Sequence, residues 1–309
     1  MKKRYYYGGQ AVVEGVMMRG QNTCVTAVRR SDGEIVVNAQ SLPKLYTGKL
    51  RNTPFLRGVI VLIESMVLGI QSIMHSANVA LEEEGEEISG WSLWLMVAFS
   101  IGFAVVLFFL APLFLTGLFN IQSPLLFNLV DGLIRIAILI IYLRIMGFVP
   151  DLRRVFSYHG AEHKTVNAYE NGVPLEKEEV RRFSTAHVRC GTSFMFTVLI
   201  ISILIFSLVG IHQTWLMVIS RIVLIPVISS ISYEAIYFSG RHTENRLVRW
   251  ITKPGLWLQS LTTREPNDDQ VEVAVAALRR VIETEEPEGV TWEVEAEEAG
   301  EETPPETAV

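Results

Sequence analysis

The sequence has few cysteines and few histidines. Its 309 residues include two cysteines, Cys24 and Cys190, and six histidines. Two cysteines so far apart make no disulfide framework of the kind that stabilises small secreted domains. The first residues are basic, but residues 5–10 lack the apolar core of a cleavable signal peptide. We therefore expect neither a disulfide scaffold nor a cleaved leader.

Charged residues are missing from long stretches of the chain. Half of the residues are hydrophobic, which is too many for an ordinary soluble domain of this length. Residues 91–119 and 193–211 contain no charged side chain, and residues 125–149 and 215–238 contain few. All four stretches are long enough to cross a bilayer as helices. The sequence predicts an α-helical integral membrane protein with four transmembrane helices.

Lysine and arginine alternate between the segments that separate these stretches. Residues 1–90 contain ten of them, residues 150–192 seven and residues 239–309 seven, whereas residues 119–124 and 212–214 contain none. Basic loops stay on the cytoplasmic side of a membrane. We therefore expect a plasma-membrane protein whose two termini and central loop are cytoplasmic.

Residues 55–80 form another long apolar pattern, but Glu64 would lie near the centre of a span. A fifth crossing would also reverse every later loop and place the basic loops outside. We expect this segment to be an interfacial amphipathic helix.

The N-terminal residues have a different pattern. Asp32-Gly33 separates two β-branched runs, at 23–30 and 34–38, which is typical of a β-hairpin. We expect a small β-rich lobe on the cytoplasmic side. An alternative, functional interpretation is that Gly8-Gly9, Glu14 and Arg19 line a site.

The chain thus divides into five predicted parts, each with its own composition. They are a β-rich lobe (1–52), an interfacial helix with an acidic loop (53–90), a four-span region (91–238) whose cytoplasmic loop is 150–192, cytoplasmic amphipathic helices (239–282) and a disordered acidic tail (283–309). Further helices are predicted over 151–169, 176–183 and 268–282, and Lys253-Pro254-Gly255 is expected to interrupt an amphipathic run.

The central loop contains two histidines four residues apart with a glutamate between them. Positions i, i+3 and i+4 of a helix share one face, so His159, Glu162 and His163 point into the same volume. This spacing offers two imidazoles to a metal ion and a carboxylate to a reacting water, in the order of the inverted zincins.

A second pair, His187 and Cys190, precedes the third span, on the same predicted side of the membrane. We expect a divalent transition metal, zinc, with ligands drawn from His159, His163, His187 and Cys190. His242 is a further candidate ligand.

A metal site can be structural or catalytic. Four protein ligands would close the site and make it structural, whereas an open position would leave room for water. Glu162 would then serve as the general base. Glu234, a carboxylate within the fourth span, is the alternative base, because a buried carboxylate in a membrane is often functional.

Four segments of the chain resemble the signature blocks of the YqhQ-like family of bacterial multi-pass membrane proteins. They are Gly8–Gly20, Tyr158–Lys164, Arg189–Phe194 and Gly240–His242, and the resemblance covers about residues 5–282. Members of that family are labelled predicted metal-dependent enzymes, so the resemblance implies a metal-dependent activity. Val188 stands where the family has proline, which leaves the ligand candidates intact.

The function expected from these observations is that of a metal-dependent hydrolase acting on a membrane-proximal peptide or lipid. A non-enzymatic scaffold with a structural metal, presenting its lobe to a protein partner, is one alternative. A transporter that uses Asp131, Arg135 and Glu234 as intramembrane charges is another. The lipid bilayer is an expected partner, and nucleic acid is not.

Overall fold

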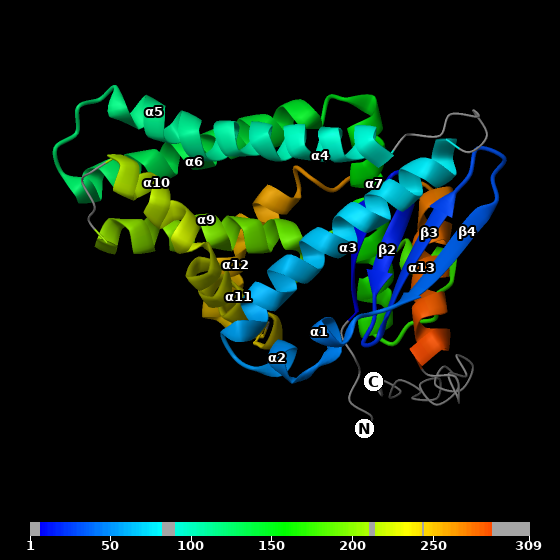
Figure 1. Cartoon of the computed structure of the whole chain (residues 1–309). Coiled ribbons are helices and arrows are strands. Elements are labelled where there is room, and N and C mark those ends of the chain that lie inside the picture. Colours follow the sequence, from blue (N-terminus) through cyan, green and yellow to red (C-terminus); the bar gives the residue numbers. More distant parts are fainter. Residues whose placement is uncertain (1–6, 82–89, 210–213, 243, 286–309) are drawn as a thin grey trace, which may run out of the picture.

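The computed structural model describes residues 7–81, 90–209, 214–242 and 244–285 (Figure 1). A small sheet with the helices that cover it forms one end of the molecule, and long apolar helices form the other. The basic start of the chain, the predicted acidic loop, most of the predicted 212–214 loop and the acidic tail beyond Glu285 lie outside the described residues.

The sheet is a four-stranded antiparallel meander in the order β1-β2-β3-β4. Its strands are β1 (Gly8–Val12), β2 (Gly15–Arg19), β3 (Thr23–Arg29) and β4 (Ile35–Ser41). The predicted hairpin is confirmed, since β3 pairs with β4 from Thr23 opposite Ser41 to Arg29 opposite Ile35. Gly33 has φ 92° in the connecting turn, a conformation that glycine adopts without steric cost.

Helices make up most of the remaining described chain. They are α1 (Lys44–Thr47), α2 (Lys49–Asn52), α3 (Leu56–Leu81), α4 (Gly90–Val105), the π-helix η2 (Val106–Leu110), α5 (Ala111–Gly117), α6 (Pro124–Met146), α7 (Pro150–Glu170), α8 (Lys177–Val180), α9 (Gly191–Val209), α10 (Thr214–Val223), α11 (Ile225–Arg241), α12 (Arg246–Gln259) and α13 (Asp268–Glu285).

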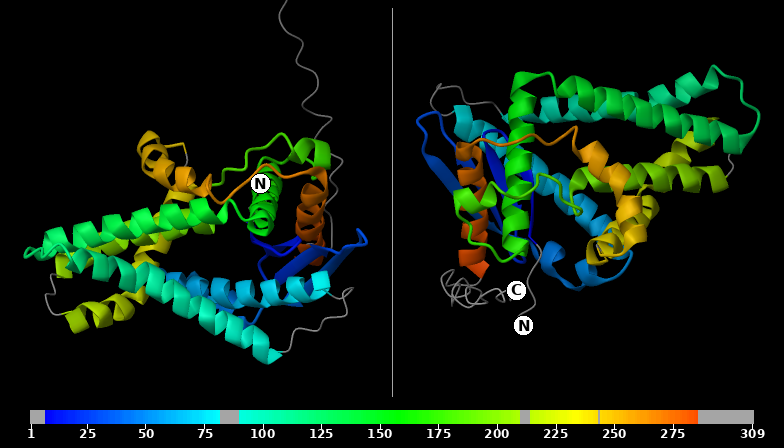
Figure 2. Two further views of the ribbon diagram at one scale, coloured as in Figure 1. Left: turned by 90° about the horizontal axis from the view of Figure 1, so that it is seen from above. Right: turned by 180° about the vertical axis from the view of Figure 1, so that it is seen from behind.

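Both faces of the sheet are covered. Side chains alternate between the two faces of a strand, so Val16 and Met18 of β2 pack with α7 and α13, whereas Met17 packs on the other side with Leu68 of α3. Figure 2 shows α7 and α13 side by side on the face seen from behind. The sheet therefore shares its core with helices from residues 150–170 and 268–285.

Helix α3 lies across the other face of the sheet, and polar contacts fix it there. The Glu64 carboxylate accepts hydrogen bonds from Arg19 Nε of β2 at 2.7 Å and from Arg51 Nε of α2 at 2.8 Å. Ser72, two turns further on, lies 3.3 Å from the hydroxyl of Thr26. These pairs explain a buried glutamate in an apolar helix, because a buried carboxylate needs charged or hydrogen-bonding partners.

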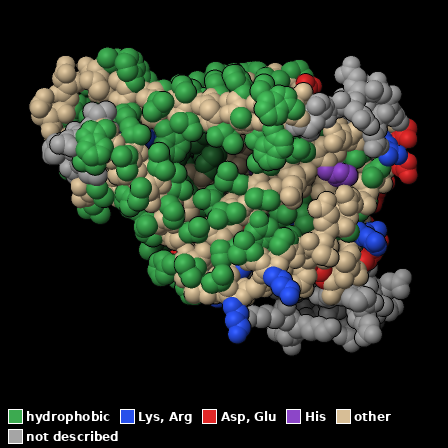
Figure 3. Space-filling model, in the orientation of Figure 1, with side chains coloured by type: hydrophobic (Ala, Val, Ile, Leu, Met, Phe, Trp, Pro, Cys, Tyr) green, Lys and Arg blue, Asp and Glu red, His purple; other side chains and the backbone are tan. Residues whose placement is uncertain are grey.

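Four helices are long and apolar enough to cross a membrane. They comprise Leu56–Ala80 of α3, Trp94–Gly117 of α4 to α5, α6 and α9. Three of them correspond to predicted spans. The segment 55–80, which we expected at the interface, meets the same length and hydropathy criteria, but its packing on the sheet sets it apart from the other three. Apolar side chains dominate the surface over the long helices, whereas charged side chains gather near the sheet and along the lower edge (Figure 3).

The fourth predicted span is not one straight helix. It consists of α10 and α11, which meet at Leu224 with a bend of 46°. Pro226 stands in the first turn of α11, where a helix tolerates the missing N–H of proline. In one continuous helix its ring would clash with the carbonyl of the preceding turn, so the proline favours a break here. If the bent pair counts as one span, the described residues contain up to five candidates.

Other helix boundaries confirm or correct the sequence predictions. Helix α7 agrees with the predicted 151–169 segment, whereas α8 covers only one turn of the predicted 176–183 helix. The prediction that Pro254 interrupts the helix is wrong, since α12 continues through it. The helix loses only the backbone N–H hydrogen bond that proline cannot donate. The tail was predicted to begin at 283, but α13 continues to Glu285, whose Oε1 accepts the backbone N–H groups of Asn22 and Thr23.

Candidate functional site

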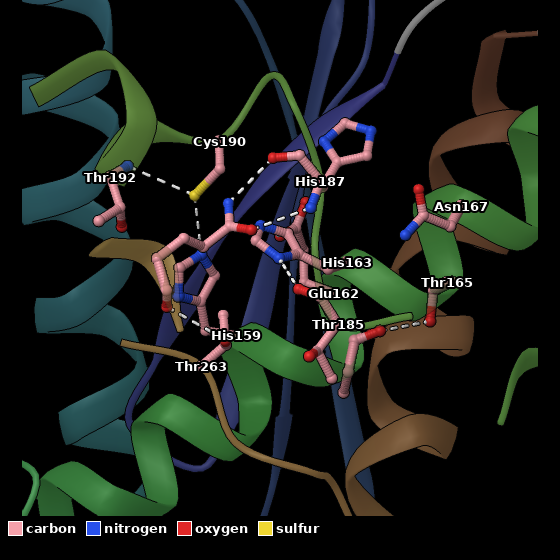
Figure 4. Close-up of polar contacts among 12 residues, drawn as sticks. His159, Glu162, His163, Thr165, Asn167, Thr185, His187, Cys190, Thr192 and Thr263 are labelled. Atoms are coloured by element: carbon pink, nitrogen blue, oxygen red, sulfur yellow. Dashed lines mark hydrogen bonds and ion pairs between the residues drawn. The ribbon is translucent and has the colours of Figure 1, made fainter. Parts of the chain in front are cut away.

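The candidate site lies where the long helices meet the sheet and its covering helices. The middle of α7 carries the predicted histidine motif, and α7 follows α6 after a three-residue connection. Two irregular segments approach this part of α7: residues 181–190, which lead into α9, and residues 260–267, which join α12 to α13. Figure 4 shows the polar side chains that these segments bring together.

Two glycines allow neighbouring segments to pack closely around α7. A Cβ atom on Gly160 would lie 2.0 Å from the carbonyl oxygen of Arg264, so only glycine lets the 260–267 segment cross α7 at this point. A Cβ atom on Gly9 of β1 would lie 2.6 Å from the carbonyl oxygen of Met17 and 2.8 Å from Cγ of Glu162. The first strand is thus packed directly against the glutamate of the motif.

Backbone carbonyls fix the orientation of the two motif histidines. His159 Nδ1 lies 2.9 Å from the carbonyl oxygen of Thr262, and His163 Nδ1 lies 2.6 Å from that of Thr185. A carbonyl can only accept, so each Nδ1 carries the proton and each Nε2 keeps its lone pair in the neutral ring. The same arrangement is common among histidines that bind metal ions through Nε2.

Cys190 completes the group. Its Sγ lies 3.2 Å from His159 Nε2 and accepts the backbone N–H of Thr192 at 3.3 Å (Figure 4). Ligand atoms of His159, His163 and Cys190 all lie within 4.8 Å of one another. Among the described residues, these three form the one group of histidine, cysteine and acidic side chains with that spacing.

The Glu162 carboxylate lies at the edge of this group. Its Oε2 is 3.4 Å from His163 Nε2, and both side chains are buried. The predicted shared face of His159, Glu162 and His163 is therefore present, with the carboxylate beside the nitrogen that faces the cysteine group.

The buried groups strongly influence one another's protonation. Burial raises the pKa of the Cys190 thiol, but its contacts with the His159 and His163 rings outweigh this and lower that pKa well below its ordinary value. Burial opposes a charge on His163, yet the Glu162 carboxylate and Cys190 Sγ raise its pKa. The cysteine thus has the character of a thiolate, the form in which sulfur binds metals or attacks carbon.

The other predicted ligands lie outside this group. His187 Nε2 lies 3.4 Å from Glu170 Oε2, and the His187 ring centroid is 5.6 Å from that of His163. His242 ends α11, where its Nδ1 bonds to the carbonyl oxygen of Phe238 and its ring stacks on that phenyl group. Three of the five predicted ligands are brought together, and His187 lies beside them.

The predicted alternative base, Glu234, is placed elsewhere. Its carboxylate binds the Arg57 guanidinium and accepts the backbone N–H of Phe55 at 3.0 Å. This ion pair joins α11 to the start of α3.

The N-terminal residues that the alternative interpretation assigned to a site have separate partners. Glu14, with φ 51° in the β1–β2 turn, binds Arg154 and accepts the Tyr158 hydroxyl at 3.2 Å. Arg19 binds Glu64 on the opposite face of the sheet. Of that set, Gly9 adjoins the candidate site.

Sequence reasoning missed the groups that hold the histidines in place. Thr185 and Thr262 act through backbone carbonyls, which leave no signal in the sequence. Gln259 is buried and exchanges two 2.9 Å hydrogen bonds with the backbone of His187. The sequence shows only a glutamine at the end of an amphipathic run, and its burial becomes visible in the structure.

We predict that Gly160→Ala disorganises the site. Its Cβ would force the 260–267 segment off α7 and break the contact between His159 and Thr262, at a cost of about 1–3 kcal/mol. The thermal midpoint of the purified protein should therefore fall. Gly191→Ala is the matched control, because its Cβ would have no atom within 4 Å. Equal stability of the two variants would contradict the importance of the close approach.

Comparison with known proteins identifies relatives of the whole chain. A family model described as a protein of unknown function (DUF1385) matches residues 53–284. The chain is also 37% identical to a Bacillus subtilis protein described as uncharacterized protein YqhQ, over 90% of this chain and 93% of the relative. No solved structure matches it. The chain therefore belongs to the DUF1385 family, and it is a relative of YqhQ.

Proposed function

We propose that this protein is a metal-dependent hydrolase that acts at the cytoplasmic surface of the plasma membrane. The observation that carries the proposal is the convergence of His159, His163 and Cys190 within 4.8 Å, with Glu162 beside them. Three protein ligands with an adjacent carboxylate are typical of catalytic zinc sites, which leave one position for water.

The donor set fits a divalent transition metal such as zinc. Two imidazole nitrogens with fixed tautomers and one thiolate are ligands that zinc prefers, and hydrogen bonds to Thr262, Thr185 and Thr192 orient all three. When bound, the metal would supply Lewis-acid activation at neutral pH.

The residues of this chain would then have separate roles in metal binding and proton transfer. His159, His163 and Cys190 hold the ion, and Glu162 accepts a proton from the attacking water and passes it to the leaving group. Gly9 positions Glu162, since β1 packs directly against its Cγ. A structural site is the competing case, in which Glu162 is a fourth ligand and no position remains for water.

The membrane location is supported by the long apolar helices and by the distribution of basic residues. The helices α6 and α9 both connect to the site at one end, at Met146 and Gly191. By the distribution of lysine and arginine, the basic segments 1–90, 150–192 and 239–309 are predicted on the same side of the membrane as the site. The proposed site would therefore lie at the cytoplasmic interface, within reach of a lipid or of a peptide that emerges from the membrane.

A second candidate function uses the same residues without a metal. His159 Nε2 lies at hydrogen-bonding distance from Cys190 Sγ, and the carbonyl of Thr262 orients the ring, as in cysteine hydrolases. Cys190 would attack a carbonyl carbon, His159 would protonate the leaving group, and water would release the acyl group from the sulfur. Metal content separates this candidate from the first.

The first test concerns topology. A cysteine introduced at Gln122, between α5 and α6, should react with a membrane-impermeant thiol reagent in intact cells, whereas one at Lys177 should react only after lysis. Both native cysteines are buried, so background labelling should be low. Labelling of Lys177→Cys in intact cells would place the site on the outer side and overturn the orientation.

The second test concerns the metal. Elemental analysis of the purified full chain should give about one transition-metal ion per molecule. His163→Ala and Cys190→Ala should each reduce metal retention at least about tenfold, because each removes one of three ligands. His187→Gln is the matched control, since this buried histidine binds Glu170 and should leave the metal in place. A metal-free wild-type protein that remains active would favour the cysteine mechanism.

The third test separates a catalytic from a structural site. Glu162→Gln should leave metal content and thermal stability unchanged, because glutamine preserves the shape of the side chain, but it should abolish complementation of a strain that lacks the gene. Glu234→Gln should complement, since that carboxylate binds Arg57 and the backbone N–H of Phe55, away from the candidate site. Full complementation by metal-loaded Glu162→Gln would overturn the role of Glu162 as general base, whereas loss of metal from this variant would identify Glu162 as a ligand of a structural site.

A further inference from the structure

A second cluster of charged side chains lies in the apolar helical region, away from the candidate site. Asp131 and Arg135 of α6 and Arg221 of α10 are 3%, 5% and 4% exposed. Arg135 Nη2 lies 3.0 Å from Asp131 Oδ2, and Arg221 Nη1 donates to Asp131 Oδ1 at 3.1 Å. The sequence predicts the first pair from its i, i+4 spacing, but the third member comes from 90 residues further along the chain.

The cluster has an excess positive charge. One carboxylate faces two guanidinium groups, and arginine does not lose its proton in proteins. Among the described residues, no second acidic side chain forms an ion pair with Arg135 or Arg221. A net charge buried among apolar helices is costly unless a counter-ion neutralises it.

Two of the buried arginine nitrogens also make no hydrogen bond within the part of the chain that the structure describes. Arg135 Nε and Arg221 Nη2 have no hydrogen-bond partner among the described residues, although Arg221 Nη2 makes an ion contact with Asp131 Oδ2 at 3.0 Å. Phe109 and Phe206 lie 5.4 Å and 5.5 Å from the two guanidinium carbons, and these ring contacts do not accept N–H bonds within the guanidinium plane.

A second cluster of one carboxylate with two arginines, at Glu64, shows the difference. Glu64 also faces two arginines, but Arg19 and Arg51 are 13% and 22% exposed, so solvent reaches them. Arg19 also donates to the carbonyl oxygen of Tyr46. Arg135 and Arg221 are instead buried, and among the described residues neither donates a hydrogen bond to a backbone carbonyl.

A small pocket adjoins Arg221. Its cavity volume is about 10 Å³, and its lining residues come from the start of α6, the end of α9 and α10; they are Asn128, Phe206, Val209, Met217, Ser220 and Arg221. A space of this size admits one particle about as small as a water molecule, and it excludes a metabolite or a lipid headgroup.

We propose that Arg135 and Arg221 bind a small monovalent anion of the chloride type. One such ion neutralises the single excess charge and accepts hydrogen bonds from the two nitrogens that lack acceptors. The ion enters from the pocket beside Arg221 and stabilises the packing of α10 on α6. This site is independent of the proposed hydrolase, because it shares no residue with the histidine and cysteine group.

The test compares chloride with the bulky anion gluconate at equal ionic strength, using the purified full chain in detergent. The thermal midpoint should rise saturably by about 2–4 °C with sodium chloride and not with sodium gluconate, since a ligand that binds only the folded state stabilises it. Equilibrium dialysis with radiolabelled chloride should detect about one bound ion per chain, displaced by bromide.

Variants assign the ion to the cluster. Arg221→Gln and Arg135→Gln each leave one carboxylate facing one arginine, so each should abolish chloride binding and the chloride-dependent shift. Arg57→Gln alters a balanced pair elsewhere, and it should keep both. Identical midpoints in the two salts with no retained chloride would mean that water alone solvates the cluster. Chloride binding that persists in both arginine variants would place the ion elsewhere; either result overturns the proposal.

Discussion

The close approach of the 260–267 segment to Gly160 holds the two ends of this molecule together at the candidate site. The segment leaves α12, crosses α7 where no side chain stands in the way, and continues into α13 on the sheet. On its way it presents the carbonyl of Thr262 to His159, and Arg264 N–H bonds to the carbonyl of Phe156 at 2.9 Å. Bulk at position 160 would disturb the orientation of His159 and the docking of α13 together.

The sheet depends on helices from distant parts of the chain to bury its two apolar faces. A sheet of four short strands buries little apolar surface by itself, and here α3 covers one face while α7 and α13 cover the other. Because α7 carries the histidine motif, its packing on β1 also positions Glu162 against Gly9. Stability of the sheet and geometry of the site are therefore coupled through one helix.

Charge on the apolar helices is balanced differently at Glu64, at Glu234 and at Asp131. At Glu64, partial exposure of the two arginines limits the cost of the excess charge. At Glu234, one arginine balances one carboxylate. At Asp131, two buried arginines face one carboxylate, and the proposed anion supplies the missing charge. The comparison indicates that an unusual charge balance, more than the presence of charge in an apolar helix, identifies a binding site.

Local patterns in the sequence predicted the features that depend on a few neighbouring residues. The turn at Asp32-Gly33 needs only a glycine with positive φ, and the shared face of His159, Glu162 and His163 follows from 3.6 residues per turn. The long apolar helices α6 and α9 likewise follow from composition. Boundaries were less predictable, since α13 continues to Glu285, which contacts Asn22 and Thr23, and α12 continues through Pro254.

The tertiary structure decided which distant residues meet. Cys190 joins His159, while His187, only three residues earlier, pairs with Glu170. Glu234 binds Arg57 instead of reaching the site, and Arg221 completes the cluster that Asp131 and Arg135 begin. Periodicity fixes which side chains share a face, because helix and strand geometry are local. Partners across 30 to 180 residues depend on how faces pack, and packing is a property of the whole chain.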